Sequence, residues 1–196
     1  MYKDGPFPGE DSEKGGVNFI RITEANDPDT ARGSGEQLAR FELGMRTDPQ
    51  FAGAEHDAFG HSWGLANVTS AEVAGVDYDK VISLSGAGML PEWEADPDTL
   101  YVDLSYRDAL QEAQSMDLVW GGNNPREHPA FDHGDYYRGP DDDVLDQVSV
   151  GMVGEYPSIY VPPDYGSVLV ENHNLIASNS DDNKRALRDM LEMVNQ

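Results

Sequence analysis

Residues 57–65 read Asp-Ala-Phe-Gly-His-Ser-Trp-Gly-Leu, and Gly60 to Gly64 in this stretch match the pattern G-x-S-x-G. In this pattern the serine lies on a tight turn between a strand and a helix. The flanking glycines allow a strained backbone and a close approach of the helix. The context fits, because a short strand at 57–59 precedes the motif and an apolar-rich helix at 65–74 follows it. The stretch therefore predicts Ser62 as a nucleophile, with the amide of Trp63 as an oxyanion donor.

Helix and strand patterns alternate on both sides of this motif. Alternation of this kind is typical of an α/β fold with a mostly parallel sheet and helices on both faces. We expect a flexible lead at 1–16 and one α/β-hydrolase-like domain at 17–196. The expected strands are Val17–Ile22, Lys80–Leu84, Met116–Trp120 and Ser167–Val170. The expected helices run from Gly35 to near Asp48, from Leu104 to Gln114, and from Asp181 to Val194, where Ser180 or Asp181 caps the helix. We expect a long loop at Gly121–Asp143.

The charge balance excludes several classes of partner. Acidic residues outnumber basic ones 37 to 13, for a formal net charge of -24. Such a field repels nucleic-acid backbones and anionic lipid surfaces, so we expect neither nucleic acid nor membrane as a partner. The acidic residues are spread along the chain, which favours a solvated, self-repelling surface over the alternative of adaptation to high salt. The chain has no cysteine, which excludes disulfides and thiolate chemistry.

The start of the chain has no apolar segment of the kind found in signal peptides. This slightly favours a cytoplasmic protein, although a chain that begins partway through a larger gene product would look the same. No run is long and apolar enough for a transmembrane helix.

The stretch from Glu36 through Met89, with LARFELGM, FGHSWG and DKVISLSGAGM, resembles the actinobacterial DUF1023 family of α/β-hydrolases, whose activity is unassigned. In that family a helix precedes a GHSYG elbow, and a strand ending in a glycine-rich loop follows it. Here Trp63 replaces the tyrosine. The later segments DLVWGGNNP, FDHGD and ENHNL correspond in order. The resemblance covers about two thirds of the chain, and the elbow is its one specific motif.

This resemblance implies a catalytic triad. Ser62 would be the nucleophile and His173 the general base, and the order serine, acid, histidine is the one this fold uses. The acid position carries Asn124, where the family has aspartate. An amide cannot stabilise the imidazolium that forms during attack, so a nearby carboxylate has to substitute or activity is low. The candidate substitutes are Glu127, Asp132 and Asp135, with Asp117 less suited because it lies inside an expected strand. We expect His61 to be structural and to point away from Ser62.

A second departure from the hydrolase pattern concerns the residues before the elbow. Hydrolases of this fold have several strands there, and a loop after one of them supplies the second oxyanion amide. Here Val17–Ile22 is the one convincing strand. A fragment, a gene model with a late start, and a shortened relative with an exposed sheet edge all remain open. Loss of one oxyanion donor costs roughly 10²- to 10³-fold in rate.

Other polar clusters favour structural interpretations. The residues His128, Asp132, His133 and Asp135 could bind a metal, but a polar loop is the preferred interpretation, so we expect no metal and no cofactor. The aspartates at 27–29 and 141–143 lack the spacing of a calcium loop and are interpreted as turns. Five aromatic side chains could line an acyl pocket: Trp63, Trp93, Trp120, Tyr136 and Tyr137. Aromatic residues near loops are more often packing residues, so packing is the preferred interpretation.

The sequence thus predicts a serine hydrolase acting on an ester or a related acyl bond of a small molecule. The alternative is a hydrolase-fold protein, weak or inactive in catalysis, that binds a ligand or partner in the same cleft. A third possibility is a salt-adapted scaffold without a site. A carboxylate bound to His173 favours the enzyme, and Asn124 alone favours the binding protein. A buried Ser62 together with a remote His173 favours the scaffold.

Overall fold

A computed structural model of the chain describes residues 10–11, 16–17, 27–115, 119–153 and 156–196. Its centre is a parallel four-stranded sheet in the order β3-β4-β5-β6. The strands are β3 (Asp57–His61), β4 (Lys80–Leu84), β5 (Leu100–Leu104) and β6 (Phe131–His133). All five residues of β4 are buried, as expected for a strand covered on both faces. The prediction of an α/β fold with a parallel sheet is confirmed.

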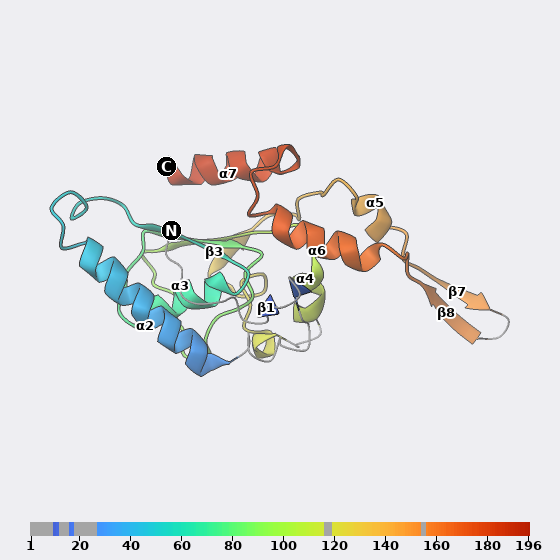
Figure 1. The fold of residues 1–196 in the computed structure, drawn as a ribbon, viewed down its shortest axis with the longest axis horizontal. Helices are drawn as coiled ribbons and strands as arrows, with labels where there is room; N and C mark the ends of the chain where they lie inside the picture. The colour runs from blue at the N-terminus through green and yellow to red at the C-terminus, as the bar shows by residue number, and fades with distance from the viewer. Residues whose placement is uncertain (1–9, 12–15, 18–26, 116–118, 154–155) are drawn as a thin grey trace.

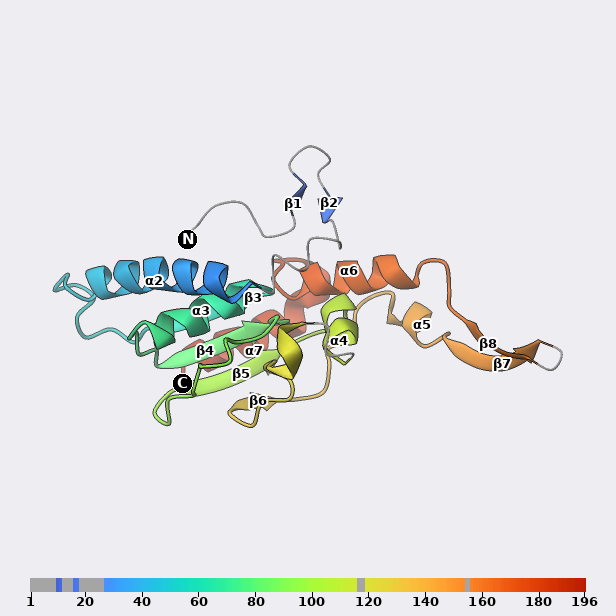
Figure 2. The same ribbon diagram turned by 90° about the horizontal axis from the view of Figure 1, so that it is seen from below.

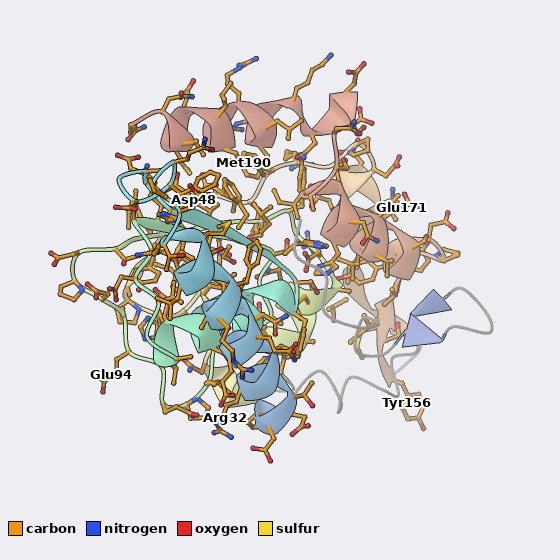
Figure 3. All side chains as sticks on the ribbon, turned by 60° about the vertical axis from the view of Figure 1, so that its left-hand side comes forward. Arg32, Asp48, Glu94, Tyr156, Glu171 and Met190 are labelled. Atoms are coloured by element: carbon orange, nitrogen blue, oxygen red, sulfur yellow. The ribbon has the colours of Figure 1, made fainter. Side chains whose placement is uncertain are left out.

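Helices cover both faces of the sheet (Figures 1 and 2). On one face α3 (Gly64–Val73) packs on the sheet, and α2 (Pro28–Met45) packs on α3. On the other face lies α7 (Lys184–Val194), with Met190 on the side turned to the sheet (Figure 3). Successive side chains of a strand point to opposite faces, so Val81 joins the α3 core and Ile82 the α7 core.

The remaining elements lie beyond the carboxyl ends of the strands. Helix α4 (Ala109–Gln114) follows β5, and α6 (Tyr165–Leu175) packs against both α4 and α5 (Asp142–Leu145). Strands β7 (Ser149–Val153) and β8 (Tyr156–Tyr160) form an antiparallel hairpin that projects from the body (Figure 2). The two-residue strands β1 (Glu10–Asp11) and β2 (Gly16–Val17) pair with each other.

Helix α2 begins earlier than the apolar periodicity predicts. The side chain of Asp27 accepts a hydrogen bond from the amide of Asp29, and Pro28 occupies the first helical position. Aspartate favours the cap position, and proline is tolerated next to it because the amide it lacks would have no helical partner. The turn expected at 27–29 is therefore the start of a helix.

Several other expectations need correction. The segment Ser167–Val170 is part of helix α6 and not a strand. The helix expected over Leu104–Gln114 begins only at Ala109, because Leu104 ends β5 and Asp108 caps α4. The loop expected over Gly121–Asp143 contains β6. Two expected strands lie partly outside the described residues: Val17–Ile22 beyond Val17, and Met116–Trp120 at residues 116–118. Trp120 begins a short 3-10 turn.

The strand Lys80–Leu84 and the helix after Ser62 are confirmed, and the final helix begins with a 3-10 turn at Asp181–Asn183 that Ser180 caps. Among the described helices, none combines the length and the apolar character needed to cross a bilayer.

Candidate functional site

Ser62 lies on a strained turn between β3 and α3. Its φ angle is 55°, in the left-handed region that residues other than glycine rarely adopt. Its amide donates to the carbonyl of Leu84 at 3.1 Å, and its carbonyl accepts from the amide of Ala87 at 2.9 Å. These two bonds tie the turn to the end of the neighbouring strand and the loop after it. The serine is thus held in the conformation that G-x-S-x-G predicts.

The two glycines of the motif are not equivalent. A Cβ on Gly60 would lie 2.6 Å from Cα of Leu65, which is closer than two carbon atoms can approach. The space around Gly64 is open, with nothing within 4 Å of such an atom. Only Gly60 is therefore required by the close approach of α3 to its strand.

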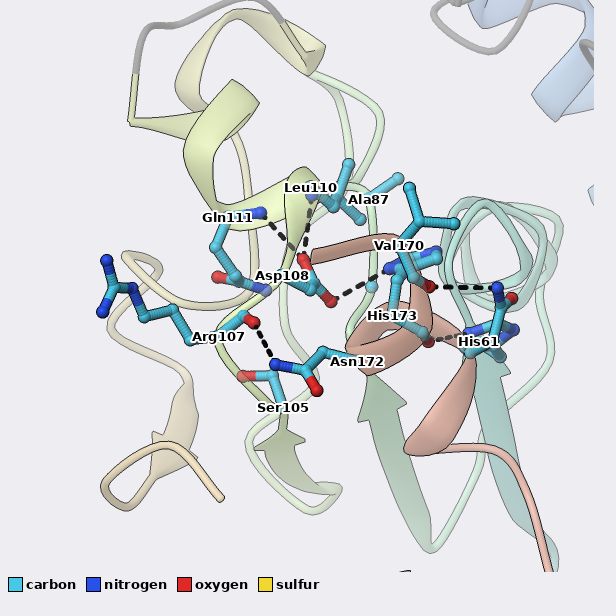
Figure 4. Close-up of polar contacts among 12 residues, drawn as sticks. His61, Ala87, Ser105, Arg107, Asp108, Leu110, Gln111, Val170, Asn172 and His173 are labelled. Atoms are coloured by element: carbon cyan, nitrogen blue, oxygen red, sulfur yellow. Dashed lines mark hydrogen bonds and ion pairs between the residues drawn. The ribbon is translucent and has the colours of Figure 1, made fainter. Parts of the chain in front are cut away.

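A histidine and an aspartate meet beyond the sheet's carboxyl edge (Figure 4). Nδ1 of His173 lies 2.9 Å from Oδ2 of Asp108. Because a carboxylate only accepts hydrogen bonds, the ring donates from Nδ1, and Nε2 is left as the acceptor. This is the tautomer that a general base needs in order to take a proton from serine.

Asp108 is fixed on both of its oxygens. Oδ1 caps α4 by accepting from the amides of Leu110 and Gln111, at 2.8 Å and 3.0 Å. Oδ2 is thereby directed to His173, and the side chain is completely buried. The buried carboxylate is thus matched by three hydrogen-bond donors, which offset the cost of removing it from water. It can therefore stabilise a positive charge that develops on the imidazole.

Helix α6, which carries His173, is held by contacts on both sides. The preceding residue, Asn172, donates to the carbonyl of Arg107 at 2.8 Å and to Oδ1 of Asp142 at 2.8 Å. On the other side, Nε2 of His61 donates to the main-chain carbonyl of His173 at 2.9 Å. The position of His173 is thus defined relative to both β5 and β3.

The side chain of His61 contacts His173 on helix α6. Its ring centroid lies 5.0 Å from that of His173, with an angle of 35° between the planes. Burial lowers the pKa of His61, and its bond to the carbonyl of His173 only partly offsets this. We infer that His61 is neutral near pH 7 and holds α6 next to the elbow.

The order of the strands places Ser62 and Asp108 two strands apart. Ser62 follows β3 and Asp108 follows β5, and these strands are second neighbours, about 10 Å apart. An imidazole with a hydrogen bond at each nitrogen spans about 8 Å. Among the described residues, the hydroxyl of Ser62 and Nε2 of His173 have no hydrogen-bond partner. Catalytic hydrogen bonds are often loose before substrate binds.

Asn124 is not the residue behind His173. Its side chain donates to Oε2 of Glu127 at 3.2 Å, and its Oδ1 accepts from the amide of Glu127 at 3.1 Å. Asn124 is buried and closes a local turn with Glu127. The expectation that Asn124 or Glu127 orients the histidine is therefore wrong, and Asp108 takes that place.

The other two proposed substitutes face a different part of the molecule. Asp132 and Asp135 line a cavity of about 410 Å³ next to α7, whose lining includes none of the three residues Ser62, Asp108 and His173. The further candidate Asp117 lies outside the described residues. Within the part of the chain that the structure describes, no three His, Asp or Glu side chains are placed to hold a metal ion.

The aromatic candidates for an acyl pocket are mostly core residues. Trp63, Trp93 and Trp120 belong to the core on the α3 face. His128 packs against Trp93, with ring centroids 5.1 Å apart, and Tyr137 donates to Asp189 at 2.6 Å. Tyr136 lies under the guanidinium of Arg126. The packing interpretation of these aromatic residues fits their burial and contacts.

Sequence reasoning missed Asp108, although two signals mark it. It stands directly before a short helical pattern, where aspartate is a favoured cap. It also lies between Ser62 and His173 in the chain, in the order serine, acid, histidine.

Comparisons with protein-family models, with curated proteins and with solved structures find no match to this chain.

Proposed function

We propose that this chain is a serine hydrolase of the α/β-hydrolase type that cleaves an ester or a related acyl bond in a small molecule. Ser62 attacks the carbonyl carbon, and Nε2 of His173 takes the proton of its hydroxyl. Asp108 stabilises the imidazolium, and the amide of Trp63 donates to the oxyanion. His173 then protonates the leaving group, and water releases the acyl group from Ser62.

The observation that carries this proposal is the bond between Asp108 and His173 next to the strained turn of Ser62. A histidine with a buried carboxylate on one nitrogen and a free second nitrogen is poised as a base. The resemblance of the elbow to the DUF1023 family points the same way, and we extend the proposal to membership of that family.

A fluorophosphonate probe tests the proposal, because it reacts covalently with an activated serine. We expect wild-type protein to be labelled on Ser62, as read by mass spectrometry of the modified peptide. Ser62→Ala should abolish labelling. The matched control is Ser85→Ala, because Ser85 also has a positive φ angle, 47°, at the end of the adjacent strand, and it is 0% exposed against 8% for Ser62.

The same probe separates the enzyme from the binding protein. Loss of the base should slow labelling by about 10²- to 10⁴-fold in His173→Ala. Folded wild-type protein that is not labelled at all would contradict the hydrolase and leave a hydrolase-fold protein that binds a ligand or partner.

A further inference from the structure

Strands β7 and β8, residues 149–153 and 156–160, form a hairpin arm that extends away from the body of the molecule (Figures 1 and 2). The strands are antiparallel, with Val150 opposite Ile159 and Gly151 opposite Ser158. Tyr156, near the end of the arm, points away from the rest of the molecule (Figure 3).

One face of the arm carries exposed aliphatic side chains. Side chains alternate between the faces of a strand, so Val150 and Met152 share a face with Ile159, opposite Val150. These three side chains are 77%, 64% and 69% exposed. None of them belongs to a hydrophobic core of the described residues. The opposite face is mixed: it carries Ser149, Gly151 and Ser158 together with Tyr156 and Tyr160, which are 79% and 54% exposed.

A hairpin of this kind needs a covering layer. Two strands alone are marginally stable in water, and a further strand or packed layer on the apolar face is usually required. Contiguous exposed apolar residues on a monomer mark contact surfaces. Val148 and Val161, which flank the strands, are 38% and 50% exposed and extend the same alternation.

We propose that the apolar face of the hairpin arm packs against the same face of a second copy of this chain, forming a homodimer. The five apolar side chains offer on the order of 500 Å² per copy, or about 1,000 Å² for the pair, the lower limit of specific interfaces. The contact is isologous, because each copy supplies the same patch.

The distribution of charge favours a second copy at this place. The chain carries a net charge of -24, yet residues 147–163 contain a single charged residue, Glu155. The arm is about 17 Å long, and antiparallel packing of two arms leaves the acidic bodies at opposite ends. That separation exceeds the Debye length of about 8 Å at physiological salt.

This arrangement predicts an unusual salt dependence. Raising NaCl from 0.1 M to 1 M shortens the Debye length from about 10 Å to about 3 Å, which removes the residual repulsion between the bodies. The dimer should therefore tighten several-fold with salt. A dimer held by ion pairs would weaken instead.

Analytical ultracentrifugation of the full chain tests the proposal with two matched variants. Ile159→Glu places a charge on the apolar face, and Ser158→Glu places the same charge one residue away on the opposite face. We expect concentration-dependent dimers for wild type and Ser158→Glu, and monomers for Ile159→Glu. Circular dichroism checks that each variant keeps the fold of the body.

The reactivity of single introduced cysteines gives a second test, which does not depend on the folding of the glutamate variants. Because the chain has no cysteine, Met152→Cys and Ser158→Cys each introduce a single reactive thiol. Reaction of Met152→Cys with a maleimide should slow at least several-fold as protein concentration rises through the dimerisation range. Reaction of Ser158→Cys should change little.

Wild-type protein that stays monomeric at every concentration and salt tested would overturn the proposal. Equal disruption by Ile159→Glu and Ser158→Glu, or equal protection of the two thiols, would do the same. Monomers that bind phosphatidylcholine vesicles through Ile159 would also overturn it, since a lipid surface would then be the occupant.

Discussion

Nδ1 of His173 lies 2.9 Å from the buried carboxylate of Asp108, although 65 residues separate them in the chain. The contact joins helix α6 to the start of α4 (Figure 4). A buried aspartate whose other oxygen caps a helix has little freedom to turn away. The imidazole is therefore held in one tautomer and one orientation, with Nε2 as its acceptor nitrogen.

Restoring aspartate at position 124 should not improve the site. Asn124→Asp places a carboxylate against Oε2 of Glu127, where the amide now donates at 3.2 Å. We expect no faster labelling of Ser62 and a loss of about 1–3 kcal/mol in the free energy of unfolding. The double variant Asn124→Asp/Glu127→Gln, which supplies a new donor, should recover part of that loss. Faster labelling in Asn124→Asp would show that position 124 serves the histidine.

His61 should act as a positioning residue. His61→Phe keeps the ring but removes the donor to the carbonyl of His173, whereas His61→Gln keeps a donor at similar reach. We expect labelling of Ser62 to slow about 10-fold in His61→Phe and to recover in His61→Gln. The apparent pKa of the labelling rate, which a purely structural role would leave unchanged, should shift in His61→Phe alone. Equal rates in all three proteins would contradict the role.

The two glycines of the elbow provide a matched pair. Gly60→Ala brings Cβ within 2.6 Å of the backbone of Leu65, so either the strand or α3 has to move. We expect a loss of about 1–3 kcal/mol in stability together with slower labelling. Gly64→Ala enters open space at the first position of α3, and its stability should stay equal or rise by less than about 1 kcal/mol. Chemical denaturation measures both.

Glu72 should make stability depend on pH near neutrality. It lies in α3, away from the elbow, and accepts hydrogen bonds from Tyr101 at 2.7 Å and from Trp93 at 2.8 Å. Burial raises its pKa to about 7. The folded state therefore holds the proton of Glu72 more tightly than the unfolded state does. The contribution of this difference to the free energy of unfolding is complete below pH 4.5 and is lost as the pH rises to about 7.

The variant Glu72→Gln isolates this effect, because glutamine is uncharged at every pH. The stability of wild type relative to Glu72→Gln should fall by about 1.4 kcal/mol per pH unit between pH 5 and 7, then level off. Urea denaturation at pH 5, 6, 7 and 8 measures the difference. A constant difference across this range would mean that Glu72 titrates normally.

Local patterns predicted the central elements well. The buried run Lys80–Leu84 and the helix after Ser62 follow from apolar composition and a motif whose turn geometry is sterically defined. The start of α2 was missed because Asp27 and Pro28 favour both turns and helix caps, and only the hydrogen bond to Asp29 decides between them.

Long-range placement was harder to predict. Ser167–Val170 has the β-branched and apolar composition of a strand, yet Val168 and Leu169 pack in a small core with Leu145, which favours a helix. The family resemblance places the partner of His173 after the segment 116–120, at Asn124. The sequence contains Asp108 in a suitable position, but nothing local indicates that a residue of α6 lies against it.

The most direct measurement is a double-mutant cycle on the rate of fluorophosphonate labelling of Ser62 with the variants Asp108→Asn and His173→Ala. In serine proteases the corresponding aspartate-to-asparagine change lowers turnover by about 10⁴-fold. If Asp108 acts through His173, each single variant should be slow and the double variant no slower than His173→Ala alone. Single effects that multiply in the double variant, or an Asp108→Asn protein labelled at the wild-type rate, would contradict the proposed site.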